Sequence, residues 1–215
     1  MKTTNKQNGI YFGIFLLIFF LVAWISQTSI GVAVDEFGHE LGNRPQSDVF
    51  TQIMELISKS GTLAIVGFSL LFSIIFAWKR KWVDLIFYYF VLIGGIIFNL
   101  VLKEIARRPR PEGREFYELF GHQLESFSFP SGHTMRATIL FLVLVIFVFK
   151  YVKNQNYQKL AVTFCLFYIL LMGFSRIMLN MHFITDVVGA IAASFAWVFL
   201  CLILMHFVTR RFLVK

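Results

Sequence analysis

Apolar residues in this chain gather into six long runs that polar segments separate. The runs cover residues 10–25, 62–78, 83–102, 131–149, 160–174 and 183–208. A helix needs about 20 mostly apolar residues to cross the hydrocarbon core of a bilayer. Several runs are shorter than that, so we expect their helices to extend into the flanking polar residues. The pattern predicts an all-α fold, a bundle of six membrane-spanning helices.

The composition supports a membrane protein. Hydrophobic residues make up 58% of the 215 positions, including 27 phenylalanines, which exceeds the apolar share of an ordinary soluble domain. Cys165 and Cys201 lie inside apolar runs and are expected to pack as small hydrophobic residues, neither forming a disulfide nor binding zinc. The first run follows a basic start, as in a signal peptide, but lacks a convincing cleavage site, so we interpret it as a retained span. No linker or repeat interrupts the chain, and residues 1–215 are predicted to form a single integral membrane domain.

Charge is distributed unequally between the two sets of helix ends. The set that includes both termini carries eleven cations and a single acid, Asp84, whereas the other set carries nine cations and eleven acids. Lysine and arginine are enriched in cytoplasmic segments of membrane proteins. We therefore expect both termini in the cytoplasm, with the connections after the first, third and fifth spans facing outward.

Three polar clusters fall on that outward side. They read "KEIARRPRP" (103–111), "FPSGHTMR" (129–136) and "SRIMLNMHFITD" (175–186). Each has an ordinary explanation when taken alone: a basic loop that contacts lipid head groups, a capped helix start, and an interfacial histidine. Ionisable residues near hydrocarbon are nevertheless costly and usually functional. Three such clusters on one face are therefore expected to assemble into a site.

Together the clusters suit an anion such as phosphate. Lys103, Arg110 and Arg176 supply fixed positive charges, and guanidinium groups match phosphate oxygens with paired hydrogen bonds. The helix that begins near Ser131 adds backbone N–H groups, and Gly132 lets a ligand approach the main chain closely. Lys103, Arg110, Gly132 and Arg176, together with the backbone of this helix start, are the predicted phosphate-binding groups.

Three further residues are predicted to be catalytic. His182 and Asp186 are four positions apart, so on a helix they share one face, and the carboxylate can orient the imidazole as a nucleophile. His133, on another span, can protonate a leaving oxygen. Arg176 is six residues before His182, about 240° away on an unbroken helix. We therefore predict a chain break between Ile177 and Met181.

The three clusters together resemble the motifs of the type 2 phosphatidic acid phosphatase (PAP2) superfamily. Residues 103–111 fit K-x6-R-P, residues 130–133 read PSGH, and residues 175–186 fit S-R-x5-H-x3-D. The motif blocks lie within residues 103–186, and no motif position departs from the pattern. The superfamily includes membrane lipid phosphatases and shares its site with vanadium haloperoxidases. The resemblance implies a six-span PAP2-type bundle and activity like that of bacterial phosphatidylglycerophosphatases and undecaprenyl-diphosphatases.

The resemblance also implies roles for the residues. The histidine at position 182 would attack phosphorus to form a phosphohistidine, Asp186 would orient it, and His133 would protonate the leaving group. The phosphoryl oxygens would be held by the remaining motif residues, Lys103, Arg110, Ser131, Gly132 and Arg176. Neither a metal nor another cofactor is expected.

Other polar residues remain ambiguous at this level. Arg107, Arg108 and Arg114 either widen the site for a diphosphate or are ordinary solvated or lipid-facing arginines. The segment 116–129 mixes aromatic and acidic residues and is predicted to be a lid along the membrane interface, and His122 within it is a weak candidate for contact with the head group. His39 and His206 fit no motif and are not expected to be catalytic.

A phosphate site among apolar helices favours an amphiphilic substrate, a lipid phosphate or diphosphate. Undecaprenyl diphosphate and phosphatidylglycerophosphate are the preferred candidates, with phosphatidate or lysophosphatidate as alternatives. The expected location is a bacterial plasma membrane, with the site facing outward and the bilayer as surroundings, and neither nucleic acid nor an obligate protein partner is expected. The rival functions are a haloperoxidase, a lipid-phosphate binding or transport protein, and a structural membrane protein; none of them accounts for both the membrane spans and the pairing of His182 with Asp186.

Overall fold

The computed structural model describes residues 4–113, 116–119 and 122–212, and it contains seven helices and a two-stranded hairpin within those ranges. Six of the helices are long and apolar enough to cross a membrane. They are α1 (Asn5–Ile25), α3 (Asp48–Trp78), α4 (Trp82–Ala106), α5 (Gly132–Tyr151), α6 (Gln155–Met178) and α7 (Ile184–Phe212). Every span extends beyond its apolar run at one end or at both. Helices α5 and α7 extend only at their C-terminal ends and begin one residue after the start of their runs. The prediction of six helices with longer true ends is confirmed.

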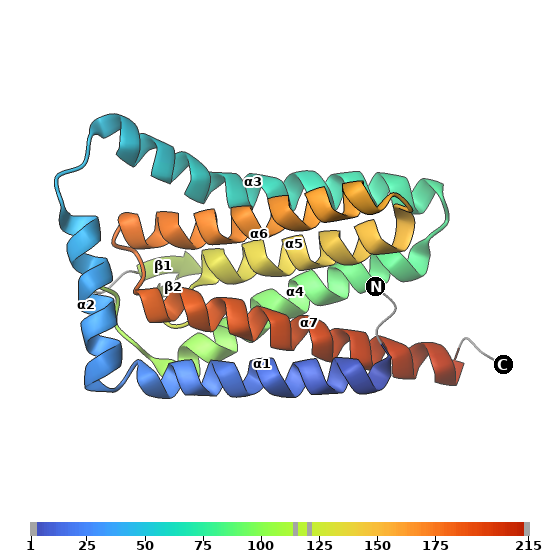
Figure 1. The fold of residues 1–215 in the computed structure, drawn as a ribbon, viewed down its shortest axis with the longest axis horizontal. Helices are drawn as coiled ribbons and strands as arrows, with labels where there is room; N and C mark the ends of the chain where they lie inside the picture. Colours follow the sequence, from blue (N-terminus) through green and yellow to red (C-terminus); the bar gives the residue numbers. More distant parts are fainter. Residues whose placement is uncertain (1–3, 114–115, 120–121, 213–215) are drawn as a thin grey trace.

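The six long helices run back and forth along one bundle, and both termini lie at the same end of it (Figure 1). Buried side chains of α4, α5 and α7 form the main core, among them Tyr88, Met135 and Ile139. The first helix packs along α7 through aromatic pairs, with Phe15 stacked on Phe195 at a centroid distance of 4.5 Å. This packing makes the first apolar run an integral part of the bundle.

The end that holds the termini also carries the basic segments. There Lys150 forms an ion pair with Asp84, and the hydroxyl of Tyr151 donates to the same carboxylate. Asp84 is the acid that the sequence places among the cations of this side, and the contact neutralises it. The polar clusters of the predicted site lie at the opposite end of the bundle (Figure 1).

The helix α2 (Ser29–Asn43) was not predicted. It runs across the end of the bundle instead of along it, at the end opposite the termini (Figure 1). Thr28 caps it by accepting a hydrogen bond from the N–H of Gly31 at 3.3 Å. Its apolar residues are too few and too scattered to form a span, so the hydropathy pattern does not reveal it.

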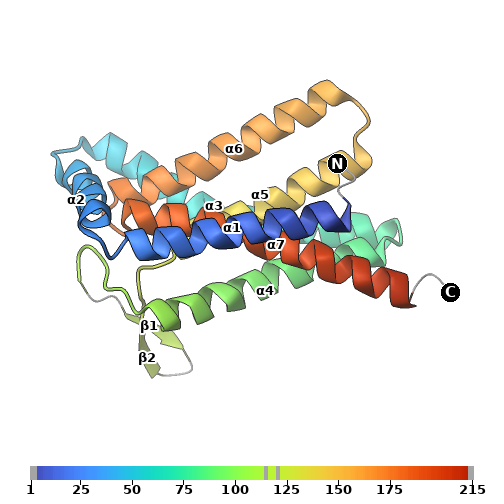
Figure 2. The ribbon, with the colours of Figure 1, turned by 60° about the horizontal axis from the view of Figure 1, so that its bottom comes forward.

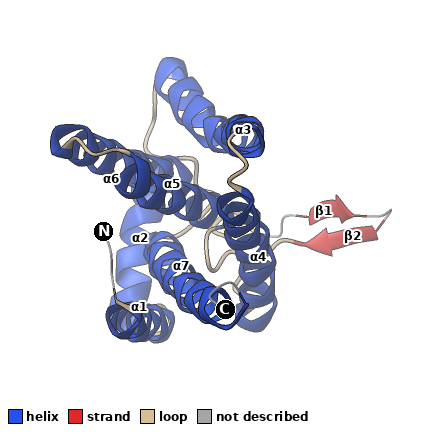
Figure 3. Ribbon diagram, turned by 90° about the vertical axis from the view of Figure 1, so that its right-hand side faces the viewer, coloured by secondary structure: helices blue, strands red, loops and turns tan. Residues whose placement is uncertain are grey.

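The connection between α4 and α5 contains a short antiparallel hairpin of β1 (Phe116–Leu119) and β2 (His122–Glu125). The hairpin projects sideways from the bundle beside the end of α4 (Figures 2 and 3). The sequence predicted a lid here and no strands. Backbone pairing of Phe116 with Glu125 through Leu119 with His122 satisfies the main-chain polar groups on the inner edges of the two strands.

Candidate active site

The predicted break between the last two spans is confirmed. Helix α6 ends at Met178, Asn180 adopts a left-handed conformation with φ of 51°, and α7 begins at Ile184. The carbonyl of Arg176 accepts the backbone N–H groups of Met181 at 3.1 Å and His182 at 3.3 Å. The turn therefore folds back on the end of α6 and fixes the backbone of His182.

The pairing of His182 with Asp186 is confirmed, but the reason given for it was wrong. His182 lies in the loop before α7, and Asp186 lies in the first turn of that helix, so the two do not share a helical face. Instead, Asp186 Oδ2 turns back toward the loop, accepts the Phe183 N–H at 2.9 Å and lies 3.5 Å from His182 Nδ1. Carboxylates in the first turn commonly accept such N–H groups.

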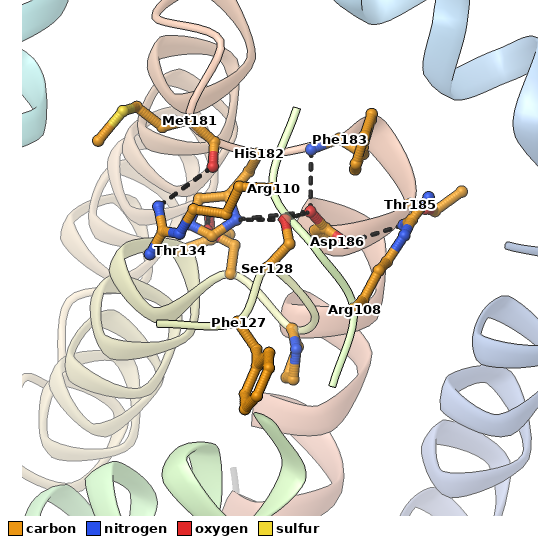
Figure 4. Close-up of polar contacts among 12 residues, drawn as sticks. Arg108, Arg110, Phe127, Ser128, Thr134, Met181, His182, Phe183, Thr185 and Asp186 are labelled. Atoms are coloured by element: carbon orange, nitrogen blue, oxygen red, sulfur yellow. Dashed lines mark hydrogen bonds and ion pairs between the residues drawn. The ribbon is translucent and has the colours of Figure 1, made fainter. Parts of the chain in front are cut away.

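A serine that the sequence analysis did not select completes this contact. The hydroxyl of Ser128 donates to Asp186 Oδ2, and its oxygen lies 3.3 Å from His182 Nδ1 (Figure 4). With Nδ1 protonated, both oxygens accept from the same edge of the ring. That arrangement assigns the lone pair to Nε2, the nitrogen suited to attack on a ligand.

Burial governs the charge of His182. Its side chain is almost fully buried, and this lowers the pKa of the imidazole from 6.5 to about 3, because burial disfavours the charged form. Asp186 acts in the opposite direction, while Arg110 and Lys103 also lower the pKa. The neutral ring, which a nucleophile requires, is therefore the resting form at neutral pH.

The two cations of the first motif are held by backbone carbonyls. Buried Lys103, in the last turn of α4, donates to the carbonyl of Phe127. Arg110 donates from Nε to the Ser126 carbonyl at 3.0 Å and from Nη1 to the Met181 carbonyl at 3.3 Å. Figure 4 shows Arg110 reaching the loop that carries His182. These contacts fix the positive groups beside the imidazole.

The second motif forms the start of α5. Ser131 is its N-cap residue, but the Ser131 side chain makes no capping hydrogen bond and contacts the Thr134 hydroxyl at 3.0 Å. The Ser131 N–H donates to the Asp186 carbonyl at 3.1 Å, which joins the start of α5 to the first turn of α7. A Cβ at Gly132 would lie 3.1 Å from Asn99 Oδ1, so a glycine suits this close approach to α4.

Five predicted residues line one cavity of about 690 Å³ between α4, α5 and the loop before α7. These are Lys103, Arg110, Gly132, His133 and His182. Ser131 and Asp186 are fully buried behind that surface. Arg176 is also buried, and its Nη1 donates to Ser58 of α3; it is not among the residues that line the cavity. The structure thus gathers both histidines and two of the three predicted cations at one surface.

The structure gives different environments to the residues that the sequence left ambiguous. Arg108 is neither a solvated arginine nor a wall of the cavity: its side chain is 12% exposed and forms ion pairs with Asp35 and Asp186. Arg107 is exposed and contacts Glu104. Arg114 lies outside the described residues, as does the side chain of His122, although the backbone of β2 is described.

Two of the three histidines outside the motifs, His39 and His206, have positions consistent with their exclusion. His39 contacts Asn180 at 3.2 Å and Asn43 at 3.0 Å, and so belongs to the packing of α2 on the turn between α6 and α7. His206 lies in the last turns of α7, whereas the cavity is lined by His182, just before the first turn of that helix.

Three residues near the site were missed by sequence reasoning. Ser128 and Asp35 bond to it across long sequence separations, and Arg136 lines the cavity one turn after His133. Only Arg136 carried a usable signal, because a cation three residues from a predicted catalytic histidine on a helix lies on the same face.

Comparison with known proteins agrees with this geometry. A family model described as the PAP2 superfamily matches residues 81–210. Phosphatidylglycerophosphatase B of Bacillus subtilis (strain 168) is 30% identical over 157 residues, which cover 72% of each chain. The crystal structure of a transmembrane PAP2 type phosphatidylglycerolphosphate phosphatase from Bacillus subtilis superposes with a TM-score of 0.77 at 24% identity, covering 93% of this chain and 98% of that one.

The family match covers more than half of the chain and includes all three motif clusters. The solved structure shares the helical fold, and the Bacillus relative is a phosphatase by name. This chain therefore belongs to the PAP2 superfamily, as a multi-pass membrane lipid phosphatase related to phosphatidylglycerophosphatase B.

Proposed function

We propose that this protein removes the terminal phosphate of a membrane lipid, without a metal ion, through a phosphohistidine at His182. The observation that carries the proposal is the cavity in which a neutral, oriented His182 faces His133 together with Lys103 and Arg110. A binding or transport protein would use the cations but would not need an imidazole oriented by Asp186 and Ser128.

The proposed reaction has two steps. In the first, His182 Nε2 attacks phosphorus, the bond between phosphorus and the leaving oxygen breaks, and His133 donates a proton to that oxygen. The ring of His182 gains positive charge, which Asp186 stabilises. In the second, water attacks phosphorus, His133 accepts a proton from it, and inorganic phosphate leaves as the His182 ring returns to neutral.

Fixed positive groups are proposed to stabilise the phosphoryl oxygens in both steps. Lys103 and Arg110 line the cavity, the first turn of α5 contributes the positive end of its dipole and the N–H of Gly132, and Ser131 and Arg176 lie buried nearby. Such preorganised groups supply the charge stabilisation for which kinases use magnesium.

The walls of the cavity favour a lipid. The lining includes apolar residues of α4, among them Ile96, Leu100 and Ile105, as well as the polar residues beside His182. Leu100 and Ile105 are exposed on the surface of a predicted span, where hydrocarbon is the expected solvent. An amphiphile can place its head group in this cavity and keep its chains in the membrane.

Arg136 favours a substrate with two phosphates. It lines the cavity on the same face of α5 as His133, and its Nε donates to the Gly132 carbonyl at 3.2 Å. A guanidinium carries five N–H donors and suits phosphate geometry. Undecaprenyl diphosphate and phosphatidylglycerophosphate both carry a second phosphate near the one that is cleaved, whereas phosphatidate does not. The name of the Bacillus relative supports phosphatidylglycerophosphate.

We further propose a bacterial plasma membrane with the cavity facing outward and both termini in the cytoplasm. The basic residues gathered at the end that holds the termini support this orientation. In that position the enzyme could recycle a lipid carrier for cell-wall synthesis. The proposed partners are the lipid substrate and the bilayer, without nucleic acid or an obligate protein partner.

Phosphate release by the purified protein tests this function. The assay is run in detergent with a chelator on undecaprenyl diphosphate, phosphatidylglycerophosphate, phosphatidate and lysophosphatidate. We expect release from the first two, and its loss in His182→Ala with lipid binding retained. Equal release from all four would indicate a broad-specificity phosphatase. Binding without release would indicate a binding or transport protein, and turnover by His182→Ala would refute the assigned nucleophile.

A further inference from the structure

One face of α2 is shaped to approach the bundle closely. Gly31, Asp35, Gly38 and Gly42 recur at intervals of four, three and four residues, so they lie on the same side of the helix. A Cβ at Gly38 would come within 2.7 Å of Ile184 Cγ1, and one at Gly42 within 2.2 Å of Asn180 Oδ1. The α2 backbone is thus seated against residues on both sides of His182, and Asp35 reaches inward from this face.

Asp35 binds the residue next to the catalytic carboxylate. Its Oδ1 accepts the Thr185 N–H at 2.9 Å, and its Oδ2 accepts the Thr185 hydroxyl at 2.7 Å. The same Oδ2 accepts Arg108 Nη2 at 2.7 Å. Asp35 is 2% exposed, so these bonds are made in a buried, weakly screened environment.

Arg108 connects Asp35 to Asp186. While Nη2 bonds to Asp35, Nη1 donates to Asp186 Oδ1 at 2.9 Å and to the Thr185 hydroxyl at 2.7 Å. The guanidinium lies over the ring of Phe183, with its carbon 4.3 Å from the centroid. Figure 4 shows Arg108 on the opposite side of Asp186 from His182. Asp186 Oδ1 is therefore engaged by Arg108, and Oδ2 is directed toward Ser128 and His182.

Charge balance gives this arrangement a role in the reaction. Arg108 alone would neutralise Asp186 and weaken its attraction for a positive imidazole. With Asp35 present, two carboxylates share one guanidinium, which leaves a net negative charge beside His182. When the His182 ring becomes positive on phosphorylation, this net negative charge attracts it. The attraction is stronger here than in water because the site is buried.

We infer that Asp35 and Arg108 are positioning residues for the reaction, through which α2 orients Asp186 and keeps its charge available to His182. The inference rests on the proposed phosphohistidine function. Neither residue lines the cavity, so the pair acts on the rate of the chemical step and not on substrate binding.

The test compares Asp35→Asn with Glu36→Gln, a change of the neighbouring exposed carboxylate on the same helix. We expect Asp35→Asn to lower kcat roughly 10-fold or more, as the loss of a buried charged hydrogen bond would. KM and the inhibition constant for inorganic phosphate should each change less than about twofold, because Asp35 does not contact the bound substrate. Glu36→Gln should match the wild type.

Non-additivity separates positioning from a structural role. In an Asp186→Asn background, assayed at higher enzyme concentration, adding Asp35→Asn should lower kcat only slightly further. The reason is that Asp35 acts through the Asp186 carboxylate, which is already removed. An equal loss in both backgrounds, or a raised KM with unchanged kcat, would overturn the inference. If Asp35→Asn does not fold, Thr185→Val makes the same comparison, since it removes the bridging hydroxyl and keeps the backbone bond to Asp35.

The wild type and His182→Ala are assayed in parallel. Lack of release by the wild type would contradict the proposed function itself. Normal release by the wild type with no effect of Asp35→Asn or Thr185→Val would contradict only the positioning role.

Discussion

Ser128 provides a direct test of how Asp186 and His182 are held together. Its hydroxyl is fully buried, donates to Asp186 Oδ2 and lies 3.3 Å from His182 Nδ1. In Ser128→Ala the carboxylate loses one charged hydrogen bond, and the ring loses an acceptor. A hydrogen bond to a charged group contributes about 1.5–3 kcal/mol.

If that contribution acts on the transition state, kcat should fall roughly 10- to 100-fold, since about 1.4 kcal/mol corresponds to a factor of ten. The hydroxyl does not line the cavity, so KM should remain nearly constant. The measurement is steady-state phosphate release from phosphatidylglycerophosphate in detergent, with protein integrity checked by size-exclusion chromatography and thermal unfolding.

Two other serine-to-alanine changes serve as controls for Ser128→Ala. Ser73→Ala removes a hydroxyl that bonds to Ser69 and Tyr89 away from the cavity, and should leave both constants unchanged. Ser126→Ala removes an acceptor of Arg110 at 2.7 Å, and should raise KM because it loosens a phosphate-binding cation. A normal kcat in Ser128→Ala would refute the idea that Ser128 supports the nucleophile.

Three further predictions concern specificity, pH and orientation. Arg136→Gln should lower kcat/KM about 10-fold for phosphatidylglycerophosphate and undecaprenyl diphosphate but much less for phosphatidate, measured by phosphate release; an equal loss on all three would contradict a second-phosphate contact. Burial lowers the pKa of His182 to about 3, so near pH 6.5 the unfolded chain takes up a proton that the folded protein does not. The contribution of this group to stability is therefore present above pH 6.5 and decreases as pH falls toward 3. Thermal unfolding in detergent at pH 7.5 and 5 should therefore show a larger loss for the wild type than for His182→Gln, and equal losses would argue against a neutral buried ring. A cysteine at exposed Glu40 should react with an impermeant thiol reagent on intact cells, whereas one at exposed Lys81 should not; the reverse pattern would place the cavity on the cytoplasmic side.

The sequence by itself determined the spans and five of the residues that line the cavity. Apolar runs of near-membrane length dictate helices, because an unsatisfied backbone is too costly in hydrocarbon. The K-x6-R-P, PSGH and S-R-x5-H-x3-D motifs identified Lys103, Arg110, Gly132, His133 and His182, all of which line one cavity. The break after α6 also followed from local geometry, since a continuous helix would turn Arg176 and His182 apart.

Only the tertiary structure decided how the Asp186 carboxylate is supported. Asp35 meets Thr185 across 150 positions, and Ser128 meets Asp186 across 58. Sequence spacing reports which residues share a face of one element, but not which elements meet. The position of α2 depends on glycines that allow its backbone to approach the turn before α7. The same limit explains the mistaken reason for the pairing of His182 with Asp186: a four-residue interval suggested a helix, whereas the chain makes the contact through a loop and a helix start.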